Sequence, residues 1–370
     1  MKELRFVLLL VSLMVLAVGV AEAGVGEHSV TVGGRSRERV APKPNSVIQD
    51  EDLYAKKAFV KWTKRFNKEY ETHTELVNRY EIWKQNKEYI MKYNRFQTEL
   101  TGVQLEMNEF GDISPEEFHA EYTGFGVDGQ LLHLRLPQLK PAKESKIMSG
   151  LPPSVDWRAK GIVTGVKNQL KCASAWAFAA VGAVESAYAR VNNLLQTLSE
   201  QHVVDCGEKY GSKGCRGGTP LNAFEFARDR GILRQLTYPY NGTQAECAYP
   251  KSSVVTTIDA FEEIPMGSEA TLTRVVASVG PVAVGIDATN RAFQFYRSGI
   301  FRDYNCARNT PSHAMLLVGY GSDADKDYWI LKNSFGTEWG DGGYFYLSRN
   351  EDNMCGIASA ASFPVIRRIE

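Results

Sequence analysis

The sequence lacks any excess of charge, because Lys plus Arg number 43 and Asp plus Glu also number 43. No global field is therefore available to attract nucleic acid or an anionic membrane surface, and partners are expected at local sites. The chain has no internal repeat and, after residue 20, no apolar run long enough to span a membrane. No cysteine precedes Cys172. These absences argue against a nucleic-acid-binding protein and against a membrane-spanning one.

What is present is enough for a globular protein that enters the secretory route. At 370 residues and 44% hydrophobic, the chain can form about two packed domains with appended segments. Lys2 and Arg5 precede an apolar run over residues 6–20, and small residues follow it. This pattern predicts a removed signal peptide over residues 1–23. A membrane anchor is the alternative, but ~15 apolar residues are short for a ~30 Å hydrocarbon core. The destination is then outside the cell or in an endolysosome.

An even number of cysteines in an exported chain favours three disulfides and leaves no spare thiol. The six are Cys172, Cys206, Cys215, Cys247, Cys306 and Cys355. The only glycosylation sequon begins at Asn241, and Gly242 within it suits an exposed turn. A glycan at Asn241 is expected, with an unmodified Asn-Gly turn as the alternative.

Two helices are predicted near the N-terminus. Residues 24–50 are rich in Gly, Ser, Arg and Pro without an apolar period, which indicates a flexible leader. Beyond it, aromatic residues recur at steps of three and four, the spacing of one helix face. They are Phe59, Trp62, Phe66 and Tyr70.

A second helical stretch places six residues on one side, at steps of three and four. They are Glu75, Arg79, Trp83, Asn86, Ile90 and Asn94. Glu75 stands four residues before Arg79, the favourable order for an intrahelical ion pair. Trp83 and Ile90 are expected to pack against the first helix. Standing alone, these residues would indicate only an ordinary amphipathic hairpin.

The remainder reads as a linker followed by an α+β body. Residues 127–150 lose the periodicity and contain prolines, which indicates a linker. Residues 175–191 predict a long helix, and residues 282–286 and 315–318 predict strands. Because helices come first and strands later, an α+β pair of subdomains is expected.

Residues 166–178 read VKNQLKCASAWAF and resemble the active-site segment of papain-like cysteine proteases, with Ala175 at the position of that family's catalytic cysteine. Residues 312–314 and 328–336 resemble the family's histidine and asparagine motifs, and residues 355–364 resemble the cathepsin L C-terminus. The resemblance covers residues 53–370. It implies an α+β papain-like fold with two lobes, a helical left domain and a β-barrel-like right domain, over residues 151–370.

The resemblance extends into residues 51–126, which it identifies as a helical inhibitory pro-region that would lie along the cleft. The six residues on one helix side match the family's E-R-F-N-I-N signature, with Trp83 in place of Phe. The companion G-x-N-x-F-x-D motif has Glu106 where its glycine would be. Its matching residues are Asn108, Phe110 and Asp112.

By analogy with the family, the disulfide pairs are expected to be Cys172 with Cys215, Cys206 with Cys247, and Cys306 with Cys355. The family's catalytic thiol would be a seventh cysteine, and six remain when only that one is missing. The cysteine count therefore agrees with the replacement at Ala175.

The papain-type reaction needs a thiolate, and the Ala175 methyl group offers no lone pair. The resemblance implies that His313 is the base, Asn333 orients it and Gln169 donates to the oxyanion with the Ala175 backbone N–H. Ser174 is adjacent, but successive side chains at a helix start point in different directions, so it is not expected to substitute. Water activated by His313 is expected to be far too slow, because losing the nucleophile costs ~10⁶ in kcat. Without a thiolate nearby, the His313 imidazole should be mostly neutral at neutral pH.

Further departures from the family pattern lie close to Ala175. Leu170 and Ala173 replace glycines, and their side chains are expected to disturb the oxyanion geometry. Phe335 replaces the tryptophan that shields the His–Asn hydrogen bond. Several changes rather than one indicate a natural pseudoprotease. The resemblance also assigns the peptide groove to Gly217, Gly218, Pro220, Ala314 and Ala360. Ala360 would form a small pocket floor that admits bulky apolar side chains.

Three functions remain open at this point. The first is a catalytically inactive cathepsin L-like protein whose groove binds extended peptides or cystatin-like inhibitors without cleavage. The second is an active cysteine endopeptidase, as homology alone would suggest, if the change at Ala175 is compensated or is a sequence error. The third is a pro-region that restrains related, active cathepsins. No metal or cofactor is implied.

Overall fold

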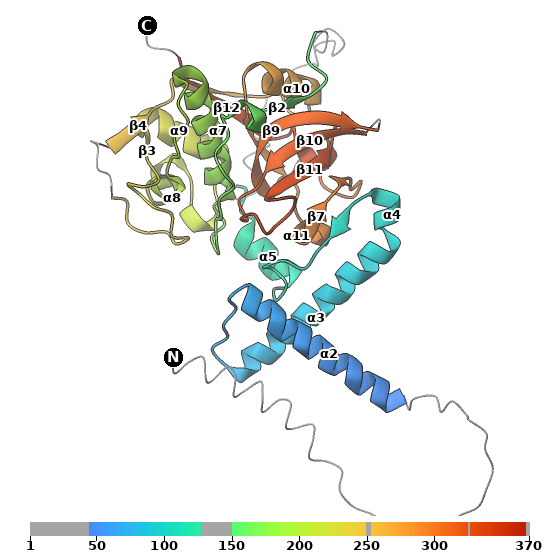
Figure 1. Ribbon diagram of the computed structural model, residues 1–370. Coiled ribbons are helices and arrows are strands. Elements are labelled where there is room, and N and C mark those ends of the chain that lie inside the picture. The colour runs from blue at the N-terminus through green and yellow to red at the C-terminus, as the bar shows by residue number, and fades with distance from the viewer. Residues whose placement is uncertain (1–43, 127–149, 249–252, 325, 368–370) are drawn as a thin grey trace, which may run out of the picture. The chain divides into compact units, whose positions relative to one another are not determined.

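The computed structural model describes residues 44–126, 150–248, 253–324 and 326–367, with only the helical backbone described for residues 44–52 (Figure 1). The predicted signal peptide and nearly all of the predicted linker lie outside these residues. The predicted leader extends to residue 50, whereas helix α2 (Pro44–Arg65) begins at Pro44. The predicted end of the leader at residue 50 is therefore wrong, since residues 44–50 belong to helix α2.

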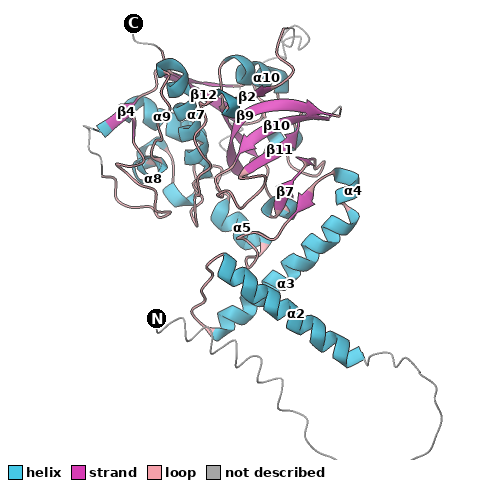
Figure 2. Cartoon of the chain, viewed as in Figure 1, coloured by secondary structure: helices cyan, strands magenta, loops and turns pink. Residues whose placement is uncertain are grey.

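Helices predominate in the first half of the described chain and the longest strands lie in the second half, but short strands also occur early and helices also occur between the later strands. Figure 2 distinguishes the two kinds of element by colour. The further helices are α3 (His73–Phe96), α4 (Thr98–Thr101), α5 (Pro115–Tyr122), α7 (Ala175–Asn192), α8 (Glu200–Cys206), α9 (Pro220–Arg230), α10 (Glu269–Ser278) and α11 (Arg291–Gln294). The strands are β1 (Gln104–Leu105), β2 (Val155–Asp156), β3 (Ile232–Leu233), β4 (Val254–Thr256), β5 (Ala260–Glu263), β6 (Val282–Ile286), β7 (Tyr296–Ser298), β8 (Ile300–Phe301), β9 (His313–Asp323), β10 (Lys326–Lys332), β11 (Tyr344–Ser348) and β12 (Ala361–Val365).

An aromatic cluster joins α2 to α3. Phe59 and Trp62 of α2 are buried against Tyr80 and Trp83 of α3, with the Phe59 and Trp83 ring centroids 5.5 Å apart. The predicted packing of Trp83 is therefore confirmed. Ile90 instead joins the main core with Val103 and Leu105, so its predicted contact with the first helix is wrong.

The end of α2 differs from the sequence prediction. The helix stops at Arg65, and Asn67 adopts a left-handed φ of 49°, so Phe66 and Tyr70 are not helical. Both rings nevertheless pack against the same aromatic cluster, because the chain turns back over it.

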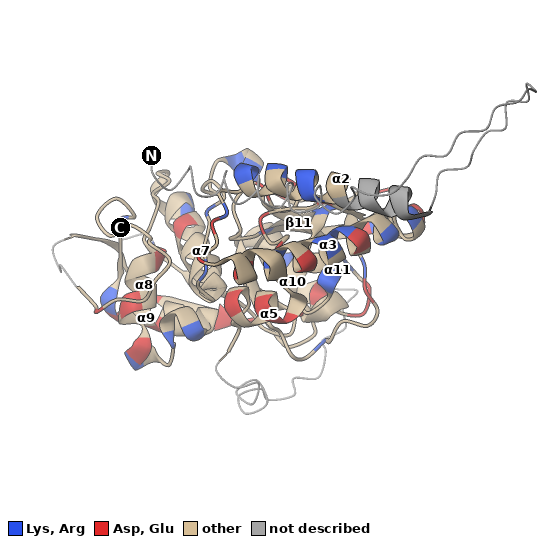
Figure 3. Cartoon of the chain, turned by 90° about the horizontal axis from the view of Figure 1, so that it is seen from below, with Lys and Arg blue, Asp and Glu red and all other residues tan. Residues whose placement is uncertain are grey.

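The opposite face of α2 is basic, as Figure 3 shows. Residues 54–65 contain five Lys or Arg residues and no acidic residue, and Lys57, Lys61 and Lys64 are exposed at helical spacing. This helix is therefore amphipathic, with an aromatic face towards α3 and a cationic face towards solvent.

The body joins a helical part to a sheet. The sheet order is β5-β12-β6-β9-β10-β11-β8, with β2 also paired to β9. Helix α7 is buried along most of its length and packs against both α9 and β9. The predicted helix over 175–191 is confirmed as α7. The predicted strand over 282–286 is confirmed as β6, and that over 315–318 lies within β9.

The three predicted disulfides are confirmed: Cys172 with Cys215, Cys206 with Cys247, and Cys306 with Cys355. Each closes a separation of 41 to 49 residues. Cross-links of this length stabilise a fold mainly by restricting the unfolded chain.

Within the described ranges, none of the helices is both long and apolar enough to cross a membrane.

Candidate active site

The first turn of α7 holds the position where the family's nucleophile is expected. Ala175 is the first residue of the helix and is 2% exposed. The neighbouring Ser174 is fully buried, and its hydroxyl lies 2.7 Å from the Tyr240 hydroxyl. Tyr240 donates its single proton to the Gln169 carbonyl at 2.7 Å, so Ser174 must donate to Tyr240. The Ser174 oxygen is thus held in an interior network, as expected for a side chain that does not substitute for the nucleophile.

Strands β9 and β10 bring His313 and Asn333 together. His313 begins β9, Asn333 follows the end of β10, and the two strands pair antiparallel. His313 Nε2 lies 2.8 Å from Asn333 Oδ1, and that oxygen also accepts from the Ser334 N–H at 2.8 Å. Because Oδ1 can only accept, His313 Nε2 donates. The other nitrogen, Nδ1, therefore carries the lone pair when the ring is neutral, and it has no hydrogen-bond partner among the described residues.

Burial lowers the pKa of His313 to about 4, although Asn333 and the Tyr122 backbone favour the charged form. This direction agrees with the predicted neutral imidazole. The Phe335 ring covers the pair, with its centroid 4.9 Å from that of the imidazole. Phe335 is 1% exposed, so it takes the shielding place that the resemblance assigns to tryptophan.

Gln169 is held in part by the loop that follows β10. Its side-chain Oε1 accepts from the Ser334 hydroxyl at 2.6 Å, and its Nε2 donates to the Tyr122 carbonyl at 3.0 Å. The donor therefore still points at a peptide carbonyl in the groove. The next residue, Leu170, adopts a left-handed φ of 54°, a conformation that disfavours any residue with a Cβ. The loop keeps a glycine-like shape even though glycine is absent, and Gln169 remains oriented.

A segment of the pro-region occupies the groove. The Gly218 N–H donates to the Gly124 carbonyl at 3.1 Å, and the Gly126 N–H donates to the Gly218 carbonyl at 2.8 Å. On the other side, the Phe125 N–H donates to the Ser312 carbonyl at 3.0 Å. Gly218 therefore contacts the pro-region directly, and its role in binding other peptides stays a prediction. Gly217 borders the groove too, since a Cβ there would meet the Gly124 carbonyl at 2.9 Å.

The Phe125 ring packs beside Gly285. A Cβ on Gly285 would lie 2.8 Å from the ring and from Pro311, so glycine at position 285 leaves the space that the ring occupies. Ala360 lies beside Gly285, and its carbonyl accepts from the Gly285 N–H at 2.9 Å. Ala314 pairs with Gly285 in the sheet. Pro220 is the first residue of α9 and is buried there, so its groove role stays a prediction.

Several residues that the structure brings to this site carry no recognisable signal in the sequence. Tyr122 and Phe125 lie in a pro-region stretch without a motif, and Tyr240 and Gly285 lie far from residue 175 in sequence. Only the three-dimensional structure shows that they lie around the same site. A bulky aromatic residue shortly after α5 was the one available signal.

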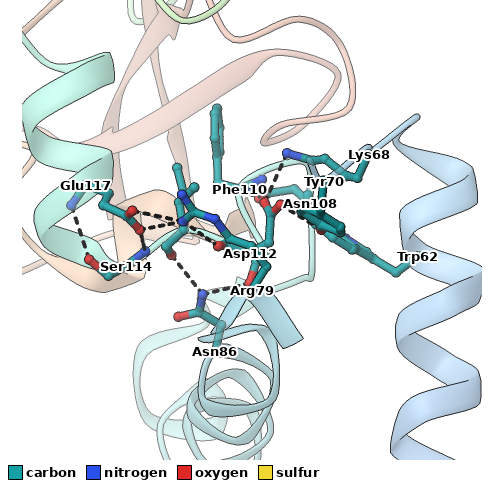
Figure 4. Close-up of polar contacts among 12 residues, drawn as sticks. Trp62, Lys68, Tyr70, Arg79, Asn86, Asn108, Phe110, Asp112, Ser114 and Glu117 are labelled. Atoms are coloured by element: carbon teal, nitrogen blue, oxygen red, sulfur yellow. Dashed lines mark hydrogen bonds and ion pairs between the residues drawn. The ribbon is translucent and has the colours of Figure 1, made fainter. Parts of the chain in front are cut away.

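The predicted pro-region motifs form one polar network (Figure 4). Asp112 accepts from the Tyr70 hydroxyl at 2.9 Å and from Lys68 at 3.0 Å. Arg79 donates to both carboxylate oxygens of Glu117 at 2.9 Å. The predicted Glu75–Arg79 ion pair is wrong, because Glu75 instead accepts from the Glu71 N–H at 2.9 Å. Its place is taken by a carboxylate 38 residues away from Arg79.

The asparagines of the motifs bind backbone. Asn86 donates to the Gly111 and Ile113 carbonyls at 2.8 and 3.0 Å, and Asn94 donates to the Leu105 carbonyl at 2.8 Å. These bonds fix the loop after α3. Phe110 is 2% exposed in the main core, and its ring centroid lies 5.1 Å from that of Phe335. Glu106, at the missing glycine, forms an exposed ion pair with Arg297.

The body holds this network through α11 and β7. Arg291 donates to Asn86 Oδ1 at 2.7 Å and lies 4.4 Å over the Tyr89 ring. Asn108 donates to the Gln294 carbonyl at 2.8 Å, and the Gln294 amide donates to the Phe110 and Ile113 carbonyls at 3.1 Å. Strand β1 also pairs with β7. The pro-region therefore docks both beside the body and inside its groove.

Comparison with known proteins finds relatives among the cathepsin L-like cysteine proteases. Residues 151–365 match the profile of the papain family of cysteine proteases, and residues 59–118 match that of the cathepsin propeptide inhibitor domain. Cathepsin L1 of Drosophila melanogaster is 41% identical over 310 residues, which covers 81% of this chain and 82% of that protein. Silicatein of Petrosia ficiformis is 40% identical over 314 residues, covering 82% and 92%. The solved structure of digestive procathepsin L 3 from Tenebrio molitor matches with a TM-score of 0.76 at 39% identity, covering 84% of this chain and 99% of that one.

Proposed function

This chain belongs to the papain family of cysteine proteases, as a cathepsin L-like member with a propeptide inhibitor domain, and from that premise we propose that it is a catalytically inactive member. Its groove binds extended peptides or cystatin-like protease inhibitors and releases them uncut. The observation that carries this proposal is Ala175 at the start of α7, while Gln169, His313 and Asn333 keep their arrangement.

The absence of any other thiol supports the proposal. All six cysteines are bonded in disulfides, so none is available to replace the missing nucleophile. The nearest hydroxyl, that of Ser174, is buried and bonded to Tyr240. A methyl group cannot form an acyl intermediate, and the neutral imidazole of His313 has no proton to take from it.

The groove itself supports peptide binding. It holds a segment of its own chain through three backbone hydrogen bonds and one aromatic anchor, Phe125. Main-chain pairing with a side-chain pocket is a recurrent way to bind extended peptides. An intact binding surface can therefore outlast the loss of the nucleophile.

Two experiments test the proposal. Incubation with a thiol-trapping epoxide, followed by mass spectrometry, is expected to leave wild-type protein unmodified and to label Ala175→Cys at residue 175. Calorimetric titration of protein freed of its pro-region with a cystatin-type inhibitor is expected to release heat at micromolar concentration. Peptide turnover by purified wild-type protein, abolished by His313→Ala, would instead establish the alternative of an active endopeptidase. Lack of heat would remove the binding function.

A second candidate function lies in the pro-region. Residues 54–126 form an extended docking surface, with motif asparagines on the loop and Phe125 in the groove. A released fragment could restrain an active, related cathepsin. Adding a fragment of residues 51–126 to a cathepsin L-like enzyme and measuring its rate tests this, and an unchanged rate would exclude it.

The predicted signal peptide and the glycosylation sequon lead to two further proposals, on the protein's compartment and on a glycan. We propose export into the secretory route, ending outside the cell or in an endolysosome, and glycosylation at Asn241, which is exposed in the structure. Asn241 Oδ1 accepts from the Thr243 hydroxyl and N–H, each at 2.9 Å. Mass spectrometry before and after glycosidase treatment tests the glycan. Without a nucleophile, the pro-region must be removed by another protease or stay attached.

A further inference from the structure

The turn over residues 241–243 places a side-chain amide next to an unpaired backbone nitrogen. Asn241-Gly242 is the only Asn-Gly step in the chain, and Asn241 is exposed outside the helices and strands. Gly242 is buried, yet its N–H has no hydrogen-bond partner among the described residues. Buried backbone N–H groups are rarely left unpaired. This nitrogen is therefore free to react with a group beside it.

The turn is held in one shape by a side chain of α8. The Asn241 N–H donates to Gln201 Oε1 at 3.0 Å, and the Gln201 amide donates to the Thr243 carbonyl at 2.7 Å. Gln201 is 1% exposed. Gly242 adopts a φ of 76°, and a Cβ there would lie 2.9 Å from the Leu170 Cβ, so the position requires glycine. The unpaired nitrogen therefore keeps its place beside Asn241.

The Asn241 side chain folds back over its own backbone. Its Oδ1 accepts from the Thr243 N–H and hydroxyl, each at 2.9 Å. Because the Thr243 N–H lies just beyond Gly242 along the chain, this bond draws the carbonyl carbon Cγ of Asn241 towards the Gly242 nitrogen. Two donors at this distance also stabilise negative charge that develops on Oδ1, as donors do in acyl-transfer sites. The turn thus both places and activates the side-chain carbonyl.

We propose that Asn241 is a site of spontaneous modification, at which the Gly242 backbone nitrogen displaces the side-chain amide and forms a cyclic imide. The nitrogen loses its proton to solvent and bonds to Asn241 Cγ, while the bond from Cγ to Nδ2 breaks. Nδ2 takes up a proton and leaves as ammonia. Water then opens the imide at either carbonyl, which gives aspartate or, with the main chain rerouted through Cγ, isoaspartate. Water is consumed and ammonia is released, and nothing is oxidised or reduced.

This inference goes beyond the proposed binding function and applies to molecules without a glycan at Asn241. A glycan is bonded to Nδ2 and would hinder its departure. Both products place a carboxylate in the turn. The isoaspartate also adds a methylene carbon to the main chain directly after Tyr240, whose hydroxyl contacts the Ser174 hydroxyl and the Gln169 carbonyl. The modification therefore lies next to a residue that holds the loop of Gln169.

The first test uses the full chain made in a host that adds no N-linked glycan. The protein is incubated in neutral buffer and digested, and mass spectrometry follows the replacement of amide by acid at each asparagine. Chromatography separates the isoaspartyl from the aspartyl peptide. Asn241 is expected to convert at least about 10-fold faster than the exposed Asn309, because the β-branched Thr310 crowds the nitrogen that would attack there. Conversion of Asn241 no faster than that of Asn309, or without isoaspartate, would overturn the proposal.

Two variants test the activation by the turn. Thr243→Val keeps the shape of the side chain but removes its hydroxyl, and it is expected to slow conversion of Asn241 by about 5- to 10-fold, the effect of one ordinary hydrogen bond. Thr243→Ser is the matched control, because it keeps the hydroxyl and should convert at the wild-type rate. In denatured protein the two variants should convert equally. Equal rates in the folded protein would overturn the activation by Thr243. No peptide or inhibitor takes part, so these results are independent of the proposed binding function.

Discussion

Arg291 of the body contacts two residues of the pro-region helix α3, and its replacement by alanine should loosen the docked state. Its guanidinium donates to Asn86 Oδ1 at 2.7 Å and covers the Tyr89 ring at 4.4 Å. Asn86 is 1% exposed, so its Oδ1 would lose the Arg291 donor while still buried. Arg291→Ala therefore removes a charge-assisted hydrogen bond and a cation–π contact together.

The magnitude follows from these contacts. A hydrogen bond to a charged group contributes about 1.5–3 kcal/mol, and a cation–π contact about 0.5–2 kcal/mol. Burial lowers the pKa of Arg291, which means that desolvation offsets part of this gain. A net loss of about 2–3 kcal/mol is expected, which raises the opening equilibrium of the pro-region about 30- to 150-fold.

Hydrogen exchange of the Glu106 amide measures this opening, because that N–H donates to the Phe295 carbonyl across the docking surface at 2.9 Å. An amide inside β10, such as that of Leu331, reports global unfolding for reference. Glu338→Gln is the matched control: Glu338 also contacts the pro-region, through Arg65, but both side chains are 57% exposed. Surface pairs of this kind contribute at most about 1 kcal/mol. The reasoning is refuted if Arg291→Ala accelerates Glu106 exchange no more than Glu338→Gln does.

Three more outcomes are expected. Burial raises the pKa of Glu109 to about 6 from an ordinary 4.5, so its contribution to stability is present below about pH 4.5 and is lost as the pH rises through about 6. Glu109→Gln should remove this loss and strengthen docking at pH 7 by about 2 kcal/mol, seen as slower Glu106 exchange; no change would exclude a buried, ionised Glu109. Because burial lowers the pKa of His313 to about 4 from 6.5, its protonation should cost stability as the pH falls from about 6.5 to 4. An NMR titration should place its midpoint below about 5, and a midpoint at or above 6.5 would contradict the buried, neutral ring. Tyr240→Phe removes the hydroxyl that links Ser174 to the Gln169 carbonyl and should lower the free energy of unfolding by about 1–2 kcal/mol in guanidinium melts. If the two hydroxyls act together, Ser174→Ala and Tyr240→Phe should not be additive, whereas additive losses would show that they are independent.

Local patterns in the sequence were enough to predict several features of this protein. Apolar spacing located α7 and β6 closely, and the ordered motifs indicated which residues would meet, including His313 with Asn333 and the three disulfide pairs. The alanine at position 175 is visible in the sequence itself. Predictions of this kind depend only on residues close together in the sequence, or on motifs whose interacting partners are known from the family.

The pairing of groups that are far apart in the sequence depended on the folded chain. Helical spacing favoured Glu75 as the partner of Arg79, but the folded chain offers Glu117 with two oxygens. The aromatic spacing also predicted that the first helix would continue to Tyr70. In the structure α2 ends at Arg65, and the chain turns at Asn67 so that Phe66 and Tyr70 pack against the same aromatic cluster. Gly124 packs closely against Ala173, which is 49 positions away in the sequence. Arg291 donates a hydrogen bond to Asn86, which is 205 positions away. A periodic pattern records which face a residue occupies, whereas the identity of its partner depends on where the rest of the chain comes to lie.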